Sequence, residues 1–266
     1  MKRESEYDAF SVAVFCVVFF LLACLTWWLE PVISRDGILY LELVGIWQKG
    51  GDFQMVLDHW NEFWLPPFYL WLCQGLIGLG IPPEVAGRGI NILCGSMLPW
   101  IVYLIAEEVQ NDKRVSLAAA ILMALNPPML ELAIEVQRDM LYLALFGWCI
   151  YFCLRGIMRK EIWSWIPAGV LFSCSILTRF ETLELIPLLC VAFLLFGLLK
   201  YTAWKRIALQ FVTMFAVSVI VFTGLLFAMG VQGHLLTSYQ KYYNGKYTLL
   251  QTLYAEPGQE GGGAKK

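Results

Sequence analysis

Acidic residues and arginines stand together at three places in a chain that is otherwise strongly apolar: 33–43, 131–142 and 178–184. Asp36 and Asp139 carry carboxylates, which can take a proton from a hydroxyl group as general bases. Arg138 and Arg179 carry planar guanidinium groups, which suit phosphate and resist deprotonation. Ionisable groups at the margin of a membrane default to a functional hypothesis, and solvation at the interface is the alternative.

The composition indicates what kind of protein must position these groups. The chain has 266 residues, of which 59% are hydrophobic and 15% charged, and its mean hydropathy is +0.64. These values indicate an integral membrane protein. The net charge of −2 is too small to suggest nucleic acid as a partner. The eight cysteines lie in apolar stretches without the Cys/His spacing of a metal site, so no metal ligand is predicted.

Eight apolar segments are candidates for membrane-spanning helices. They are 10–29, 66–80, 89–106, 115–130, 140–154, 162–178, 183–199 and 207–230. The first is too long for the apolar core of a signal peptide and lacks a small-residue cleavage site, so we interpret it as a retained span. Segment 66–80 starts at two prolines and would rise about 22 Å as a helix, against about 30 Å for the hydrocarbon core. Length alone leaves this segment undecided.

Basic residues decide between two topologies, because Lys and Arg in short loops concentrate on the cytoplasmic side. If 66–80 lies at the outer surface, ten of the nineteen basic residues fall in cytoplasmic segments. If it spans, the later basic loops all fall outside. We therefore predict a module of seven spans at residues 1–230, with the N-terminus inside. The tail, 231–266, then lies outside, and its Gly-rich end is predicted to be disordered.

This topology places the three acidic patches on the outer side, the first of them in a long outer loop at about 30–88. Asp36 precedes an amphipathic stretch, so capping of a helix is the alternative to a chemical role. The apolar residues of that stretch are Ile38, Leu41, Val44 and Trp47. Glu131, Glu135 and Asp139 follow one another at four-residue spacing, so a helical conformation would align them on one face.

Further polar residues on this side are candidate substrate contacts, and each has a structural alternative. Tyr40 and His59 belong to the first outer loop, where an interfacial tyrosine or an exposed histidine is common. Arg88 opens the second span, where snorkelling explains it without chemistry. Glu135 can pair with Arg138 at the surface, an arrangement that contributes little to stability. Arg179 and Glu181 are candidates both for phosphate and sugar contacts and for a structural pair between two spans.

The order of these features resembles the GT-C superfamily of membrane glycosyltransferases. The features are an acid soon after the first span, the amphipathic stretch, "PPFYLW" at 66–71, an Arg before the second span, an acid before the fourth span, and "LTRFE" at 177–181. The greatest likeness is to the protein O-mannosyltransferases and the aminoarabinose transferases that modify lipid A. The resemblance extends over residues 1 to about 230 and rests on the order of the features.

The resemblance implies an all-α module with amphipathic juxtamembrane helices and an inverting displacement on a polyprenyl-phosphate sugar. It assigns Asp36 as the general base and Asp139 as the second acidic position. Relatives often have Asp-Glu where this chain has Asp36 and Gly37, and a basic residue where it has Leu65. The phosphate contact then falls to other residues, the candidates being Arg35, His59, Arg88, Arg138 and Arg179.

We therefore expect a glycosyltransferase that acts at the outer face of a bacterial inner membrane, embedded in the lipid bilayer. Its acceptor is a lipid, a glycan or a protein. Related enzymes differ in their need for a metal, so the cofactor is open, with a divalent ion as one option. The short chain makes a partner subunit a further expectation. Two other classes stay open: a transporter or flippase, and a non-catalytic scaffold subunit of an envelope-assembly complex.

Overall fold

The computed structural model describes residues 2–49, 56, 66–198, 203–231 and 244. Regular structure in these ranges is helical throughout. The helices are α1 (Lys2–Leu29), α2 (Arg35–Gln48), α4 (Pro67–Gly78), α5 (Pro83–Gln110), α6 (Lys113–Ala124), α7 (Pro127–Ile134), α8 (Asp139–Met158), α9 (Trp165–Thr178), α10 (Glu181–Glu184), α11 (Ile186–Leu198) and α12 (Trp204–Met229). The all-α class predicted from the sequence is confirmed for the residues described.

Four helices of the described chain are long and apolar enough to cross a membrane: Ala9–Leu29 within α1, and α5, α8 and α12. A fifth crossing results if α6 and α7, which are bent by 51°, count as one broken span. The helices α9 and α11 are shorter, with 14 and 13 residues. The protein is thus a multi-pass membrane protein, and the full number of seven spans stays a prediction.

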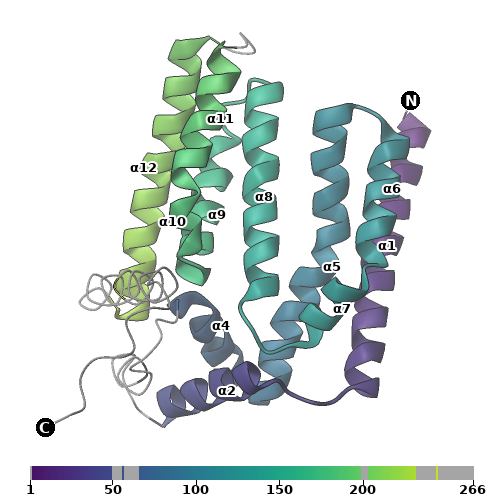
Figure 1. Ribbon diagram of the computed structural model, residues 1–266, viewed down its shortest axis with the longest axis vertical. Helices are drawn as coiled ribbons and strands as arrows, with labels where there is room; N and C mark the ends of the chain where they lie inside the picture. Colours follow the sequence, from purple (N-terminus) through teal and green to yellow (C-terminus); the bar gives the residue numbers. More distant parts are fainter. Residues whose placement is uncertain (1, 50–55, 57–65, 199–202, 232–243, 245–266) are drawn as a thin grey trace, which may run out of the picture.

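Helix α4, which covers most of the undecided segment 66–80, is not among the helices long enough to span. It starts at Pro67, where a missing backbone N–H costs nothing in the first turn, and is followed by Gly80 with a φ of +88°. Its 12 residues rise about 18 Å, well short of the hydrocarbon thickness of about 30 Å. In Figure 1 it lies with α2 at the lower end of the bundle.

The two ends of the helix bundle differ in the charged residues that they carry. The long helices run roughly parallel, and α2, α4 and α7 gather at the end opposite the N-terminus (Figure 1). The connections from α5 to α6 and from α8 to α9 lie at the N-terminal end, where Lys113 and Arg114 begin α6 and Arg159 and Lys160 follow α8. The acidic patches therefore lie at the other end, as the charge-based topology predicts, whichever way the bundle faces.

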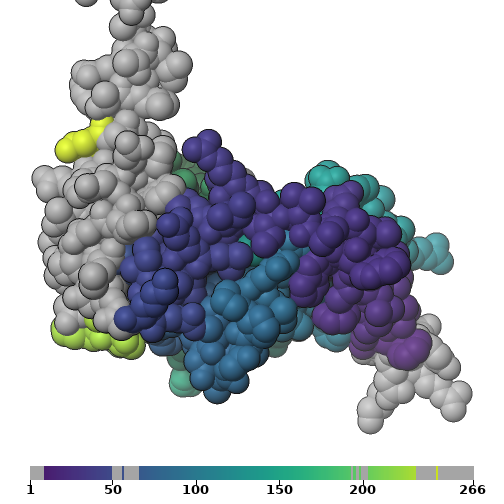
Figure 2. Space-filling view, turned by 90° about the horizontal axis from the view of Figure 1, so that it is seen from below, coloured from purple at the N-terminus to yellow at the C-terminus, as the bar shows by residue number. Residues whose placement is uncertain are grey.

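Helix α2 lies against α4 and α5. Figure 2, viewed from below, shows the surfaces of α1, α2 and the beginning of α5 adjoining one another. The buried face of α2 consists of Gly37, Tyr40, Leu43 and Val44. Ile38, which the sequence pattern placed on the apolar face, is 57% exposed, so that part of the pattern was wrong. The face is rotated because the helix turns Tyr40 and Leu43, rather than Ile38, toward α4.

Candidate active site

Three segments far apart in sequence carry the candidate groups. They are the beginning of α2, the bend 135–138 with the start of α8, and the end of α9 with α10. The helices place all three at the lower end of the bundle in Figure 1. Charged residues from the three patches therefore share one end of the molecule, which sequence spacing alone could not establish.

Asp36 lies in the first turn of α2 and is exposed. The N-cap of this helix is Ser34, whose Oγ accepts a hydrogen bond of 3.1 Å from the Gly37 backbone N–H. The capping role considered for Asp36 is thus filled by another residue. A carboxylate in the first turn of a helix also interacts favourably with the helix dipole.

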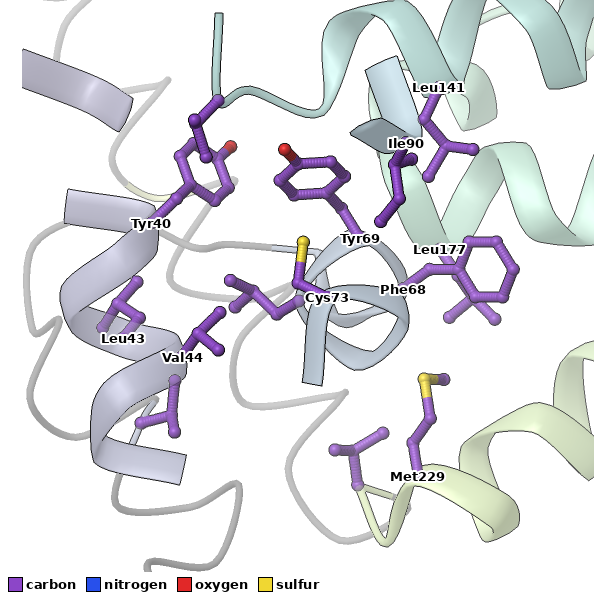
Figure 3. Packing of buried hydrophobic residues seen from close by; sticks show 14 of the residues in the cluster. Tyr40, Leu43, Val44, Phe68, Tyr69, Cys73, Ile90, Leu141, Leu177 and Met229 are labelled. Atoms are coloured by element: carbon purple, nitrogen blue, oxygen red, sulfur yellow. The ribbon is translucent and has the colours of Figure 1, made fainter. Parts of the chain in front are cut away.

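Tyr40 is a buried tyrosine on which charged residues of all three segments act electrostatically. Its ring is 6% exposed and meets the Tyr69 ring edge to face, with centroids 5.4 Å apart. Figure 3 shows both hydroxyl groups at the same side of the α2–α4 contact, above Cys73. Burial raises the pKa of Tyr40 to about 12, and four charged groups act on it in addition: Arg138, Asp139, Asp36 and Arg179. The arginines lower this pKa and the acids raise it, so all four lie within electrostatic reach of the hydroxyl.

The bend 135–138 separates α7 from α8 and carries Arg138. It contains neither Gly nor Pro, so local sequence gives no reason for the helix to stop. Asn91 of α5 donates from Nδ2 to the carbonyls of Glu135 at 2.5 Å and Gln137 at 2.7 Å. These hydrogen bonds from α5 replace the hydrogen bonds that the two carbonyls would form within a continuous helix. Glu131, Glu135 and Asp139 consequently do not form the single helical face that their spacing allowed.

The same bend packs tightly against α2 and α5. A Cβ on Gly37 would lie 3.4 Å from Val136 Cβ, and one on Gly87 only 2.6 Å from Val136 Cγ1. The Gln137 Nε2 also donates to Ser34 Oγ at 3.4 Å. These contacts fix the start of α2 and the bend relative to each other. Asp36 is thereby brought toward Arg138.

Arg88 is 1% exposed, and the structure gives it backbone partners. Its Nη2 donates to the carbonyls of Pro31 at 3.3 Å and Val32 at 3.0 Å, and its Nε lies 3.2 Å from Glu84 Oε1. The guanidinium also lies 5.4 Å from the centre of the Trp27 ring. Arg88 thus ties the linker between α1 and α2 to α5, a contact that neither snorkelling nor phosphate binding anticipated.

Arg179 ends α9 and pairs with Asp139, the first residue of α8. The Nη1 to Oδ1 distance is 2.5 Å, and the guanidinium lies 5.6 Å from the centre of the Tyr142 ring. Glu181 is more distant, with Oε2 3.7 Å from Arg179 Nε. Both partners of the closer pair are partly exposed, so it contributes at most about 1 kcal/mol to stability. Such a pair can be exchanged for another anion at little cost.

Several charged atoms of this region are buried without a hydrogen-bond partner in the described residues: Glu135 Oε2, Arg138 Nη1 and Arg179 Nε. Buried polar atoms are normally paired, so each such atom needs an explanation. Two are guanidinium donors with a spare N–H group. An anion with several oxygens, such as a phosphate, matches donors of this kind.

Other predicted residues stand apart from this group. His59 lies outside the described residues, as do Leu65, almost all of the C-terminal tail and its Gly-rich end. Within the described part of the chain, no group of three or more His, Cys, Asp or Glu side chains is placed to hold a metal ion. All eight cysteines are free thiols.

Sequence reasoning missed the residues that position the site: Ser34, Asn91 and Gln137. Asn91 carried the clearest signal, because it is an amide in the otherwise apolar segment 89–106. A polar side chain within a membrane helix commonly hydrogen-bonds across to a neighbouring segment. Which carbonyls it reaches depended on the tertiary structure.

Comparison with known families decides what kind of protein this site belongs to. A family described as dolichyl-phosphate-mannose-protein mannosyltransferase matches residues 65–227, more than half of the chain. The chain belongs to this family. The GT-C superfamily expected from the sequence is confirmed, and the subgroup stays a prediction. No curated protein matches the chain.

The mannosyltransferase match supports a membrane glycosyltransferase that uses a sugar linked to a polyprenyl phosphate. It includes Arg88, the bend 135–138, Asp139 and Arg179. Asp36 and Tyr40 precede the matched residues. They are connected to the matched residues by contacts: Gln137 bonds to Ser34 at the start of α2, and the Tyr40 ring packs against Tyr69.

Proposed function

We propose that the protein transfers a sugar from a polyprenyl-phosphate donor to an acceptor hydroxyl at the outer face of the membrane, with inversion at the anomeric carbon. The observation that carries this proposal is the joining of three charged segments: Arg179 pairs with Asp139 at the start of α8, and the bend that carries Arg138 is bonded through Gln137 to Ser34, two residues before Asp36. Acids and arginines from three segments meet there in a chain of the mannosyltransferase family. Inversion follows from a single displacement, in which the acceptor oxygen attacks the face opposite the departing phosphate.

Asp36 is the proposed general base. It is exposed in the first turn of α2, and Ser34 supplies the cap, so its carboxylate is available to an incoming hydroxyl group. As the acceptor oxygen attacks, Asp36 takes its proton, and the bond between the anomeric carbon and the phosphate oxygen breaks. A positioned general base accelerates such a step by about 10² to 10⁴-fold.

Arg138 and Arg179 are the proposed phosphate contacts. Each has a guanidinium nitrogen buried without a hydrogen-bond partner in the described chain. A departing phosphate gains negative charge, and fixed guanidinium donors stabilise that charge without reorganisation. Asp139 holds Arg179 when the phosphate is not bound. Tyr40, whose pKa of about 12 keeps its hydroxyl protonated at neutral pH, is a hydrogen-bond donor to the sugar or the phosphate.

The proposal includes the seven-span topology with the site on the outer side of a bacterial inner membrane. Helices α9 and α11 are then the fifth and sixth crossings, interrupted at Arg179 and α10. The basic connections at the opposite end of the bundle support a cytoplasmic position for that end.

Transfer of labelled mannose tests the proposal. Purified protein is given polyprenyl-phosphate mannose carrying ³H in the sugar, together with native membranes as the source of acceptors, and label in lipid and protein fractions is counted. Asp36→Asn keeps the size of the side chain, so donor binding should persist while turnover falls by about 10² to 10⁴-fold.

Glu30→Gln is the matched control, because Glu30 is an exposed acid in the linker that leads into α2. It should turn over like the wild type. Wild-type turnover by Asp36→Asn would remove Asp36 from the mechanism. A wild-type protein that neither binds nor consumes the donor would favour the scaffold or the transporter.

A further inference from the structure

The first turns of α5 hold two of the three segments that carry the site, together with α4. The Gly87 carbonyl accepts a hydrogen bond from the Tyr69 hydroxyl of α4 at 3.1 Å. One residue later, Arg88 holds the carbonyls of Pro31 and Val32, just before α2. Asn91, one turn further, holds the bend that leads into α8. The three residues are neighbours on α5, so this stretch of helix fixes the relative positions of α2, α4 and α8.

We infer that Asn91 is a positioning residue for donor binding, acting through Arg138. The inference rests on the proposed function and adds to it a residue that touches no substrate. Asn91 is 0% exposed, and both hydrogen bonds from its Nδ2 end on the bend, at the carbonyls on either side of Val136. Arg138 follows directly after the second of these carbonyls.

The bend depends on these bonds for its shape. Backbone carbonyls outside a helix need partners when they are buried, and Asn91 supplies them from a neighbouring helix. Each Nδ2 hydrogen is directed to one carbonyl, so the amide fixes both ends of the Glu135–Gln137 segment. Arg138 directly follows the segment that is fixed at these two points, so the bonds from Asn91 determine where the Arg138 side chain leaves the backbone.

Asn91→Ala removes both donors, and Gln210→Ala provides a matched control. Gln210 is also a 0% exposed amide, its Nε2 donates to the Gly156 carbonyl at 3.0 Å, and its Oε1, like Asn91 Oδ1, has no hydrogen-bond partner within the described residues. Gly156 lies near the end of α8, away from the bend. The two variants therefore lose buried amide hydrogen bonds at opposite ends of α8, two for Asn91→Ala and one for Gln210→Ala.

Binding of undecaprenyl phosphate to the purified full chain, measured by native mass spectrometry, is the first readout. Asn91→Ala should weaken binding about tenfold, the affinity equivalent of one to two hydrogen bonds. Gln210→Ala should bind like the wild type, although both variants melt at a lower temperature. In an Arg138→Ala background, Asn91→Ala should cause no further loss of affinity, because its effect passes through Arg138. Additive losses in this double variant would overturn the inference.

Hydrogen exchange supplies a readout that needs no ligand. Asn91→Ala should speed exchange of backbone amides in 135–142 and leave 155–162 unchanged, whereas Gln210→Ala should do the reverse. One outcome is that the wild type fails to bind undecaprenyl phosphate while the exchange pattern is as expected. In that case the proposed function is wrong, but the role of Asn91 in fixing the bend is supported. If Asn91→Ala changes neither exchange in the bend nor affinity, the inference is wrong whatever the enzyme binds.

Discussion

Two glycines of α5 allow the packing of the bend to be tested by a paired substitution. Gly87 and Gly89 lie two residues apart in the same helix. An alanine Cβ at Gly87 would lie 2.6 Å from Val136 Cγ1 and 3.1 Å from the Tyr69 hydroxyl oxygen, whereas at Gly89 nothing lies within 4 Å. Both substitutions change the helix propensity and the entropy of the unfolded chain alike. Their difference therefore reports the contacts that only a Gly87 side chain would make, chiefly the 2.6 Å contact with Val136.

The magnitudes follow from this geometry. Alanine is favoured over glycine in a helix interior by about 0.5 to 1 kcal/mol, so Gly89→Ala should stabilise the protein by that amount. Gly87→Ala receives the same gain but forces Val136 to move, and overpacking of this kind costs about 1 to 3 kcal/mol. The free energy of unfolding of Gly87→Ala should therefore lie about 1 to 3 kcal/mol below that of Gly89→Ala.

Equilibrium unfolding in mixed micelles of mild detergent and dodecyl sulfate measures the difference. Val136→Ala removes both methyl groups that Gly87→Ala would meet, so in that background the two alanine variants should become nearly equal. Because Val136 belongs to the bend, Gly87→Ala should also weaken binding of undecaprenyl phosphate, and Gly89→Ala should not. Equal stability of the two single variants would refute the close packing of Val136 on α5.

Three further predictions address charge, pH and topology. Arg179→Ala should weaken binding of undecaprenyl phosphate by about 10 to 100-fold, the loss of a charge-assisted bond, and Arg179→Lys should recover part of the affinity; unchanged affinity in native mass spectra contradicts a phosphate contact. Burial raises the pKa of Tyr40 to about 12, so stability present below pH about 10 should decline as the pH rises toward 12, and thermal melts of Tyr40→Phe should show a shallower decline. In a cysteine-free background, a thiol reagent that cannot cross the membrane should label Glu131→Cys in intact cells but not Arg114→Cys; the reverse pattern contradicts the orientation.

Apolar runs and proline positions were sufficient to predict most of the helices. The segment 140–154 lies within α8 (Asp139–Met158), and 207–230 corresponds closely to α12 (Trp204–Met229). The same signals left 66–80 undecided, and the basic residues of the later loops were needed to place it outside the spans. A long apolar helix is specified locally, because nearly every residue in it favours both the helix and the lipid.

The details of the site depended on contacts that no local pattern contains. The four-residue spacing of Glu131, Glu135 and Asp139 is compatible with one helix. The chain nevertheless bends where Asn91 donates hydrogen bonds to two backbone carbonyls. From the sequence, Arg88 was expected to be an arginine at the membrane interface. In the structure it is buried and holds the linker by hydrogen bonds to two of its carbonyls. In both cases a bond between segments more than 40 residues apart decided the outcome.

Gly37 illustrates how such a contact bears on the chemistry. Relatives of the predicted group often carry Glu after the first Asp, and this chain has Gly. A Cβ here would lie 2.7 Å from Ile33 Cγ2, 3.2 Å from Ser34 Oγ and 3.4 Å from Val136 Cβ, so any larger side chain would displace the linker, the cap or the bend. The glycine thus lets α2 approach the segment that carries Arg138. In the proposed mechanism, Arg138 of the bend and Arg179 supply the charge for the phosphate, and the second acid is Asp139, which pairs with Arg179.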